Sequence, residues 1–196
     1  MVASLKKIIL VFGLGLSISY SSWGQNYQEL SATDAITSET MNLGGMVGQK
    51  GLVLIFHSLN CPFAKMYEKR IIALREKFQN QGIAFVLVNP ETSNGEADQT
   101  PLRNHVNQAG LNMSYLIDAG QSWTKLFQIT KLPEVVFLVP GENGLSIAYR
   151  GAIDNNAQAE SAVSEHHLER AINQILKGES PTPAQVRAVG CNIRTY

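Results

Sequence analysis

The chemistry in this sequence of 196 residues centres on one cysteine, Cys61. Cys61 directly follows an apolar run typical of a buried strand, and Pro62 stands where the first position of a helix is expected. Free amides and the positive end of the helix dipole stabilise a thiolate there and lower the pKa of the thiol. Because thiolates attack disulfides and peroxides far better than thiols do, this position predicts a redox-reactive cysteine. The alternative is a buried cysteine that acts as a small hydrophobic residue.

Two further features could serve such a site. Ser58 lies three residues before Cys61, so its hydroxyl could support the sulfur or a bound oxygen atom, or could simply cap the turn. Leu132-Pro133 opens a later apolar strand, where a proline suggests a special backbone role. A cis peptide there would leave edge groups free to bind an extended partner chain. A trans proline that starts a strand is the simpler interpretation of the local sequence.

Other kinds of site do not emerge. Two cysteines, Cys61 and Cys191, are too few for a scaffold of several disulfides or for a four-cysteine zinc site. The neighbours His166 and His167 would point about 100° apart on a helix and so would not chelate one metal ion together. His57 lies close to Cys61 in sequence and could tune the pKa of its thiol, but we favour the interpretation that it is a hydrogen-bonded structural histidine. We therefore predict no metal and no cofactor.

The composition excludes several classes of protein. The chain has 16 basic and 16 acidic side chains, whereas a nucleic-acid binder usually has a basic excess or a basic stripe. The hydrophobic fraction is 44% and the charged fraction is 16%, which indicates a folded chain rather than a disordered one. The length suits one compact domain.

The first residues have the pattern of a secretory signal. Lys6 and Lys7 precede a short apolar run, and the small residues Ser22 and Gly24 follow it. With about 13 apolar residues, the run is too short to span a bilayer. We expect residues 1–24 to be cleaved, which leaves a mature chain with a net charge of −2.

Export has consequences for the cysteines and for the location. The mature protein is expected to be periplasmic or secreted, with no stable membrane association and no nucleic-acid partner. Thiols in such an oxidising compartment are either paired or chemically active.

The rest of the chain alternates apolar strands with amphipathic helices. Strands are expected over residues 51–57, 83–89, 115–117, 134–139 and 145–149. Helices are expected over residues 61–81, from Thr100-Pro101 to 110, around 123–127 and over 159–176. This order predicts one α/β domain over residues 25–178, followed by a tail over residues 179–196 that packs on it.

Residues 56–70, Phe-His-Ser-Leu-Asn-Cys-Pro-Phe-Ala-Lys-Met-Tyr-Glu-Lys-Arg, resemble the signature of bacterial peroxiredoxin-like proteins of the thioredoxin-fold superfamily. The broader group includes the alkyl hydroperoxide reductases. The resemblance continues through Leu132-Pro133, residues 149–154 and residues 190–193. It implies a thioredoxin-like fold, with a central mixed β-sheet flanked by helices. It also implies that Cys61 is the active cysteine and that Pro133 is a cis-proline facing it.

The chain departs from these relatives at several positions. Thioredoxins carry a second cysteine three residues after the first, and Ala64 stands there, so a local dithiol cycle is impossible. Standard peroxiredoxins have a proline seven residues before the reactive cysteine and a threonine three residues before it; these positions are Leu54 and Ser58. Their active-site arginine is replaced by Lys131 and Leu132. The pattern therefore predicts a thiol oxidoreductase or a weak thiol peroxidase.

Cys191 has two possible roles. As a resolving cysteine, it would condense with a sulfenic acid on Cys61. As a structural partner, it would form a permanent disulfide that closes a loop of about 130 residues and contributes about 4–5 kcal/mol in the chain-entropy model.

The predicted function is that of an exported thiol-dependent oxidoreductase. Cys61 would react with a small peroxide or a protein disulfide, and a thiol partner would supply the electrons. The alternative is a non-catalytic thioredoxin-fold module that binds a partner along Leu132-Pro133 and has a structural Cys61–Cys191 disulfide.

Overall fold

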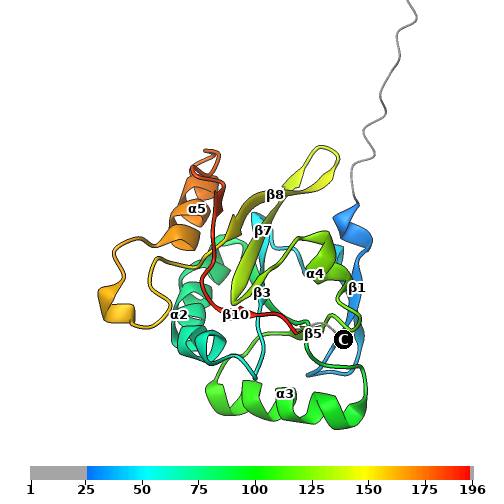
Figure 1. The fold of residues 1–196 in the computed structure, drawn as a ribbon. Coiled ribbons are helices and arrows are strands. Elements are labelled where there is room, and N and C mark those ends of the chain that lie inside the picture. Colours follow the sequence, from blue (N-terminus) through cyan, green and yellow to red (C-terminus); the bar gives the residue numbers. More distant parts are fainter. Residues whose placement is uncertain (1–25, 195–196) are drawn as a thin grey trace, which may run out of the picture.

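The computed structural model describes residues 26–194, so the predicted signal segment, residues 1–24, lies outside the described residues. The chain forms a mixed sheet of eight strands in the order β2-β1-β5-β4-β3-β7-β8-β9, with helices on both faces (Figure 1). A separate small sheet pairs β10 with β6. This architecture confirms the predicted α/β class with a central mixed sheet flanked by helices.

The elements follow one another along the described chain with short connections. The strands of the large sheet are β1 (Ser31–Asp34), β2 (Thr40–Asn42), β3 (Gly51–Phe56), β4 (Ile83–Asn89), β5 (Tyr115–Ile117), β7 (Glu134–Gly141), β8 (Gly144–Gly151) and β9 (Gln185–Val186). The small sheet contains β6 (Lys131–Leu132) and β10 (Cys191–Asn192). The α-helices are α1 (Leu43–Met46), α2 (Pro62–Phe78), α3 (Glu96–Ala109), α4 (Ser122–Leu126) and α5 (His167–Leu176). Single 3₁₀ turns are η1 (Tyr27–Glu29), η2 (Gln79–Gln81) and η3 (Glu160–Ala162).

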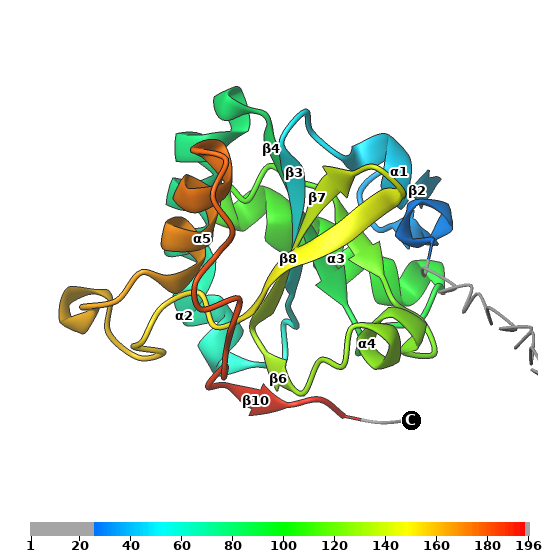
Figure 2. The ribbon, with the colours of Figure 1, turned by 90° about the horizontal axis from the view of Figure 1, so that it is seen from above.

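Strand β3 lies at the centre of the sheet and is buried on both faces. Val53 and Ile55 join a core cluster with α2, α3 and α5, whereas Leu54 and Phe56 join a second cluster that includes residues of α1 and α4 (Figure 2). A strand covered by helices on both faces needs apolar residues at every position, as this one has.

The pairing of the strands brings the two halves of the candidate site together. β3 runs parallel to β4 and antiparallel to β7, and Phe56 is opposite Glu134 in this register. Pro133 directly precedes Glu134, so it lies at the end of β3 from which the chain turns into α2. The loop that carries Cys61 and the segment before β7 therefore meet at one edge of the fold.

Helix α3 begins earlier than predicted. It starts at Glu96, so Pro101 lies in its second turn rather than at its first position. The carbonyl of Gly95 accepts the amide of Gln99 at 3.1 Å, and the Gln99 side chain donates to the carbonyl of Asn94 at 2.7 Å. These local bonds form a helical turn ahead of Pro101. The prediction from Thr100-Pro101, which took the proline as the first helical position, therefore placed the start of the helix too late.

Helix α5 begins later than predicted. The chain before it makes a separate turn, η3, and continues in an extended form up to the helix. The Asn155 side-chain oxygen accepts the amides of Ser164 and Glu165 at 3.1 and 3.2 Å, and its Nδ2 donates to the Ser164 hydroxyl at 2.7 Å. These contacts keep the segment before His167 from joining α5, although its composition is compatible with a helix.

The tail after α5 adds a strand to each sheet. β9 pairs in parallel with β8 at the point where Gly151 adopts a φ of +130°. A Cβ on Gly151 would lie 1.7 Å from the carbonyl oxygen of Val186, so only glycine allows this contact. None of the helices in the described part of the chain has the length and hydropathy needed to cross a bilayer.

Candidate redox site

Cys61 is the N-cap residue of α2, as its sequence position predicts. Pro62 occupies the first helical position, and the backbone N–H of Ala64 points at the Cys61 sulfur with an N···S distance of 3.4 Å. The carbonyl oxygen of Leu132 lies 3.1 Å from the same sulfur. In the reduced protein, the amide is placed to stabilise a thiolate and the carbonyl to accept the hydrogen of a neutral thiol.

Cys61 forms a disulfide with Cys191, 130 residues further along the chain. The two Cα atoms are 5.8 Å apart, inside the range of about 4.4–6.8 Å that a disulfide requires. Cys61 is 1% exposed and Cys191 is partly exposed. The structure therefore joins the two cysteines, and Cys191 is the more exposed residue of the pair.

The pairing of β10 with β6 brings Cys191 to this site. Cys191 is opposite Leu132 and Asn192 is opposite Lys131 in an antiparallel register. The Leu132-Pro133 peptide bond is cis. The edge predicted to bind an extended partner is thus covered by the chain's own tail in this structure (Figure 2).

Ser58 holds the turn before Cys61. Its hydroxyl donates to Glu91 Oε2 at 2.6 Å and accepts the amide of Asn60 at 3.1 Å, while its carbonyl accepts the amide of Cys61 at 3.1 Å. The hydroxyl that could have supported the sulfur is therefore engaged with the turn and with a neighbouring carboxylate.

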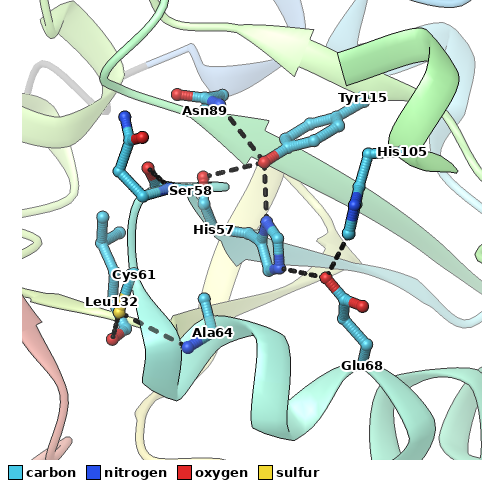
Figure 3. A network of polar contacts seen from close by, with 10 residues as sticks. His57, Ser58, Cys61, Ala64, Glu68, Asn89, His105, Tyr115 and Leu132 are labelled. Carbon is cyan, nitrogen blue, oxygen red and sulfur yellow. Dashed lines mark hydrogen bonds and ion pairs between the residues drawn. The ribbon is translucent and has the colours of Figure 1, made fainter. Parts of the chain in front are cut away.

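His57 belongs to a buried polar network behind Cys61 (Figure 3). Its Nδ1 lies 2.7 Å from the Tyr115 hydroxyl, which also accepts from Asn89 Nδ2 at 3.2 Å. Its Nε2 lies 3.2 Å from Glu68 Oε1, and His105 Nε2 approaches the same oxygen to 2.6 Å. His57 thus contacts Tyr115 through Nδ1 and faces the Glu68 carboxylate with Nε2, so it links the sheet to α2, which supports its interpretation as a structural histidine.

Burial sets the charges in this network. Complete burial lowers the pKa of His57, although the Glu68 carboxylate opposes the effect. Burial raises the pKa of Glu68, but its hydrogen bonds to His57 and His105 outweigh burial, and the pKa is lowered overall. A neutral His57 beside an ionised Glu68 fits these directions.

The unfolding free energy should therefore fall as the pH is lowered from about 7 to about 5.5. Below pH 6.5 an unfolded histidine takes up a proton that buried His57 resists, so the unfolded state binds more protons. One such group changes the unfolding free energy by at most about 1.4 kcal/mol per pH unit. His167, whose pKa burial also lowers, acts with the same sign. Chemical denaturation at several pH values should give a smaller slope for His57→Gln than for the wild type; an unchanged slope would contradict the assignment.

Two residues of the site carried no signal in the sequence. Glu91 Oε1 accepts the backbone N–H of Arg194 at 2.9 Å, and Gln121 Nε2 donates to the carbonyl of Arg194 at 2.5 Å. Glu91 follows β4 and Gln121 is the N-cap residue of α4, so both come from loops remote from the tail in sequence. Within residues 26–194, no group of three or more His, Cys, Asp or Glu side chains is arranged to hold a metal ion.

Comparison with known proteins identifies a family and a fold. A family model described as AhpC/TSA family matches residues 23–151. No curated protein matches the sequence significantly. Among solved structures, an uncharacterised conserved protein from Geobacillus kaustophilus is similar with a TM-score of 0.76 and 20% identity, over 88% of this chain and 92% of that one.

Two other solved structures extend the comparison. A hypothetical protein from Sinorhizobium meliloti has a TM-score of 0.73 and 24% identity, over 88% of this chain and 94% of its own. A secreted Mycobacterium tuberculosis disulfide oxidoreductase, homologous to E. coli DsbE, has a TM-score of 0.53 and 19% identity, over 75% of this chain and 96% of its own. These similarities show the thioredoxin-like fold.

Proposed function

Because this chain belongs to the AhpC/TSA family, we propose that it is a thiol–disulfide oxidoreductase whose Cys61 and Cys191 cycle between a disulfide and two thiols. The observation that carries the proposal is the disulfide between a helix N-cap cysteine and a cysteine on a short tail strand. A helix N-terminus makes Cys61 a good leaving group when the bond is broken, and a two-residue strand on the tail can move aside more easily than a strand of the central sheet.

Reduction should begin at Cys191. Its sulfur belongs to the more exposed residue of the pair, and attack there expels the Cys61 thiolate toward the amide of Ala64. A dithiol partner first forms a mixed disulfide with Cys191. The second partner thiolate then attacks the partner's own sulfur and releases the Cys191 thiol. Two electrons pass from the partner to the protein, and the partner leaves as a disulfide.

Oxidation reverses the cycle from Cys61. The Cys61 thiolate attacks a substrate disulfide and displaces one substrate thiolate, and Cys191 then attacks Cys61 to release the second. A peroxide can serve as the oxidant in a second route, in which Cys61 becomes a sulfenic acid and condenses with Cys191 to release water. The family match favours this second route. Against it, the Ser58 hydroxyl is hydrogen-bonded to Glu91 and the Lys131 ammonium to Asn192, so both polar groups that could assist a peroxide at Cys61 are engaged with other residues. We therefore rank disulfide exchange first and weak peroxidase activity second.

We also propose that the protein is exported. The pattern of residues 1–24 supports this, as does a paired cysteine, which is typical of oxidising compartments. The M. tuberculosis relative in fold is described as secreted. The partners we expect are proteins with reactive thiols or disulfides, together with small peroxides.

The substrate class is tested by differential alkylation and mass spectrometry. Reduced wild type and Cys191→Ser are exposed to oxidised glutathione or to hydrogen peroxide, and free thiols are then labelled. Oxidised glutathione should leave a stable mixed disulfide on Cys61 in Cys191→Ser, and should restore the internal disulfide in the wild type. Peroxide should give the same internal disulfide more slowly. Complete alkylation of Cys61 after both oxidants would exclude the proposed activity.

A further inference from the structure

The tail is fixed to the domain on both sides of Cys191. Before the cysteine, β9, which ends at Val186, pairs in parallel with β8. After it, the backbone of Arg194 lies between two side chains: Glu91 Oε1 accepts its N–H at 2.9 Å, and Gln121 Nε2 donates to its carbonyl at 2.5 Å. We call Glu91 and Gln121 the tail clamp. Cys191 is therefore carried on a short segment that has a separate anchor at each end.

The clamp residues are built into the fold rather than lying on its surface. Glu91 and Gln121 are only 9% and 5% exposed, whereas the Arg194 side chain is exposed. Gln121 Nε2 also donates to the carbonyl of Pro90 at 3.1 Å. The backbone of Gln121 is left-handed, with a φ of +61°, a conformation that only a few per cent of residues other than glycine adopt. Such conformations cluster at functional sites, so this residue calls for a role beyond packing.

Glu91 also joins the tail to the turn that carries Cys61. While its Oε1 accepts from Arg194, its Oε2 accepts the Ser58 hydroxyl at 2.6 Å. The carbonyl of Ser58 in turn accepts the amide of Cys61 at 3.1 Å. One buried carboxylate therefore holds the two segments that carry the sulfur atoms in a fixed relation to each other.

We propose that Glu91 and Gln121 are positioning residues for closure of the Cys61–Cys191 disulfide, because they keep the tail anchored while the bond is open. Three residues of chain span at most about 11 Å, so Cys191 can leave the Cys61 sulfur and still stay near it while Arg194 is held. A tethered thiol acts at a high effective concentration, which favours the internal disulfide over a mixed one. This inference rests on the proposed redox function, in which the pair opens and closes.

The step that the clamp assists is the second half of oxidation. With oxidised glutathione as the oxidant, the Cys61 thiolate displaces one glutathione thiolate and forms a mixed disulfide with the other half. The Cys191 thiolate then attacks the Cys61 sulfur, the bond between Cys61 and glutathione breaks, and the second glutathione thiolate leaves. The two protein thiols lose two electrons and two protons, and glutathione disulfide gains them to become two thiols. The clamp acts on the main chain three residues from Cys191, so it sets the position of this thiol and leaves the chemistry to the sulfur atoms.

The first test measures the equilibrium constant for closure. Wild type and variants are equilibrated with mixtures of reduced and oxidised glutathione, and the disulfide fraction is measured by alkylation and mass spectrometry. Gln121→Asn keeps an amide that tolerates the left-handed backbone but shortens its reach, and Glu91→Gln keeps one acceptor oxygen. Each variant should lower the constant about threefold to tenfold, where tenfold corresponds to about 30 mV in reduction potential. Gln108→Asn makes the same change at an exposed position of α3 and should stay within twofold of the wild type.

A second measurement separates positioning from damage to the site. In Cys191→Ser, Cys61 forms its mixed disulfide with glutathione without any help from the tail. Adding Gln121→Asn to this variant should therefore leave the single-turnover rate within twofold. A loss of rate as large as the loss in the equilibrium constant would mean that the substitution disturbs Cys61 itself, and would overturn the positioning role.

Anchoring with the bond open is measured by hydrogen exchange of the Arg194 amide in Cys61→Ser/Cys191→Ser, followed by nuclear magnetic resonance. Exchange should be at least threefold slower than in the same protein with Gln121→Asn added, and equal rates overturn the anchor. The glutathione equilibrium distinguishes the two proposals. A wild-type pair that exchanges with a constant unaffected by Gln121→Asn and Glu91→Gln overturns only the clamp. A wild-type pair that does not exchange at all overturns the proposed function, and the role of the clamp in closure with it.

Discussion

Replacing either cysteine with serine should lower the rate of repeated thiol–disulfide exchange by about 100-fold or more, because each cycle needs both sulfur atoms. The two variants should stop at different points. Cys191→Ser keeps the N-cap thiol and should accumulate a mixed disulfide with the substrate on Cys61. Cys61→Ser retains only a tail thiol with no helix N-terminus beside it, and should react in a single turnover several-fold more slowly. Turnover is followed with a dithiol reductant and a disulfide-linked peptide, and the trapped species by mass spectrometry.

A matched control distinguishes chemistry from damage to the tail. Ser180→Ala changes an exposed residue of the same tail and should keep the wild-type rate. If Cys61→Ser retained more than half of the turnover, the assignment of Cys61 as the exchanging cysteine would be wrong.

Removing the carboxylate of Asp154 should lower the unfolding free energy by about 3–5 kcal/mol, because it leaves a buried guanidinium without its counter-charge. Arg70 Nη1 donates to Asp154 Oδ2 at 2.6 Å, and the two side chains are 8% and 3% exposed. Asp154 Oδ1 also accepts the Tyr67 hydroxyl at 2.8 Å and the amide of Asn156 at 2.9 Å. This carboxylate therefore connects α2 to the loop that follows β8. Guanidinium denaturation of Asp154→Ala measures the loss.

An exposed ion pair provides the comparison. Lys77 Nζ also lies 2.6 Å from a carboxylate oxygen, that of Glu169, but the side chains are 51% and 29% exposed. Glu169→Ala should cost less than about 1 kcal/mol, since solvent screens such a pair. Asp154→Asn keeps one of the two acceptor oxygens and should fall between the two. If Asp154→Ala and Glu169→Ala lost the same amount, the buried pair would not have the structural role assigned to it.

The parts of the fold that local sequence determines were predicted well. β3 and β4 are recognisable because their residues are apolar at nearly every position, and α2 begins at Pro62 directly after Cys61. The N-cap position of Cys61 follows from these two neighbours alone. It needs no knowledge of the rest of the chain.

The parts that depend on distant residues were not predictable in the same way. The contact between Arg194 and Glu91 spans 103 residues, and that between Ser58 and Glu91 spans 33. Nothing in the neighbourhood of Glu91 or Gln121 in sequence indicates a backbone clamp. The start of α5 depends on hydrogen bonds from Asn155 across a loop, which no periodicity reveals. The polar network around His57 likewise needs α2, α3 and β5 in their final positions.

The most direct test of the central claim is the redox equilibrium of the Cys61–Cys191 pair in the folded protein. Wild-type protein is equilibrated in dithiothreitol buffers of graded potential, the disulfide fraction is measured by alkylation, and near-ultraviolet circular dichroism reports the fold. A redox-active pair should be reduced and reoxidised reversibly, without unfolding, at a potential above about −300 mV. A bond that stays intact until the protein is denatured would identify a structural disulfide and contradict the account.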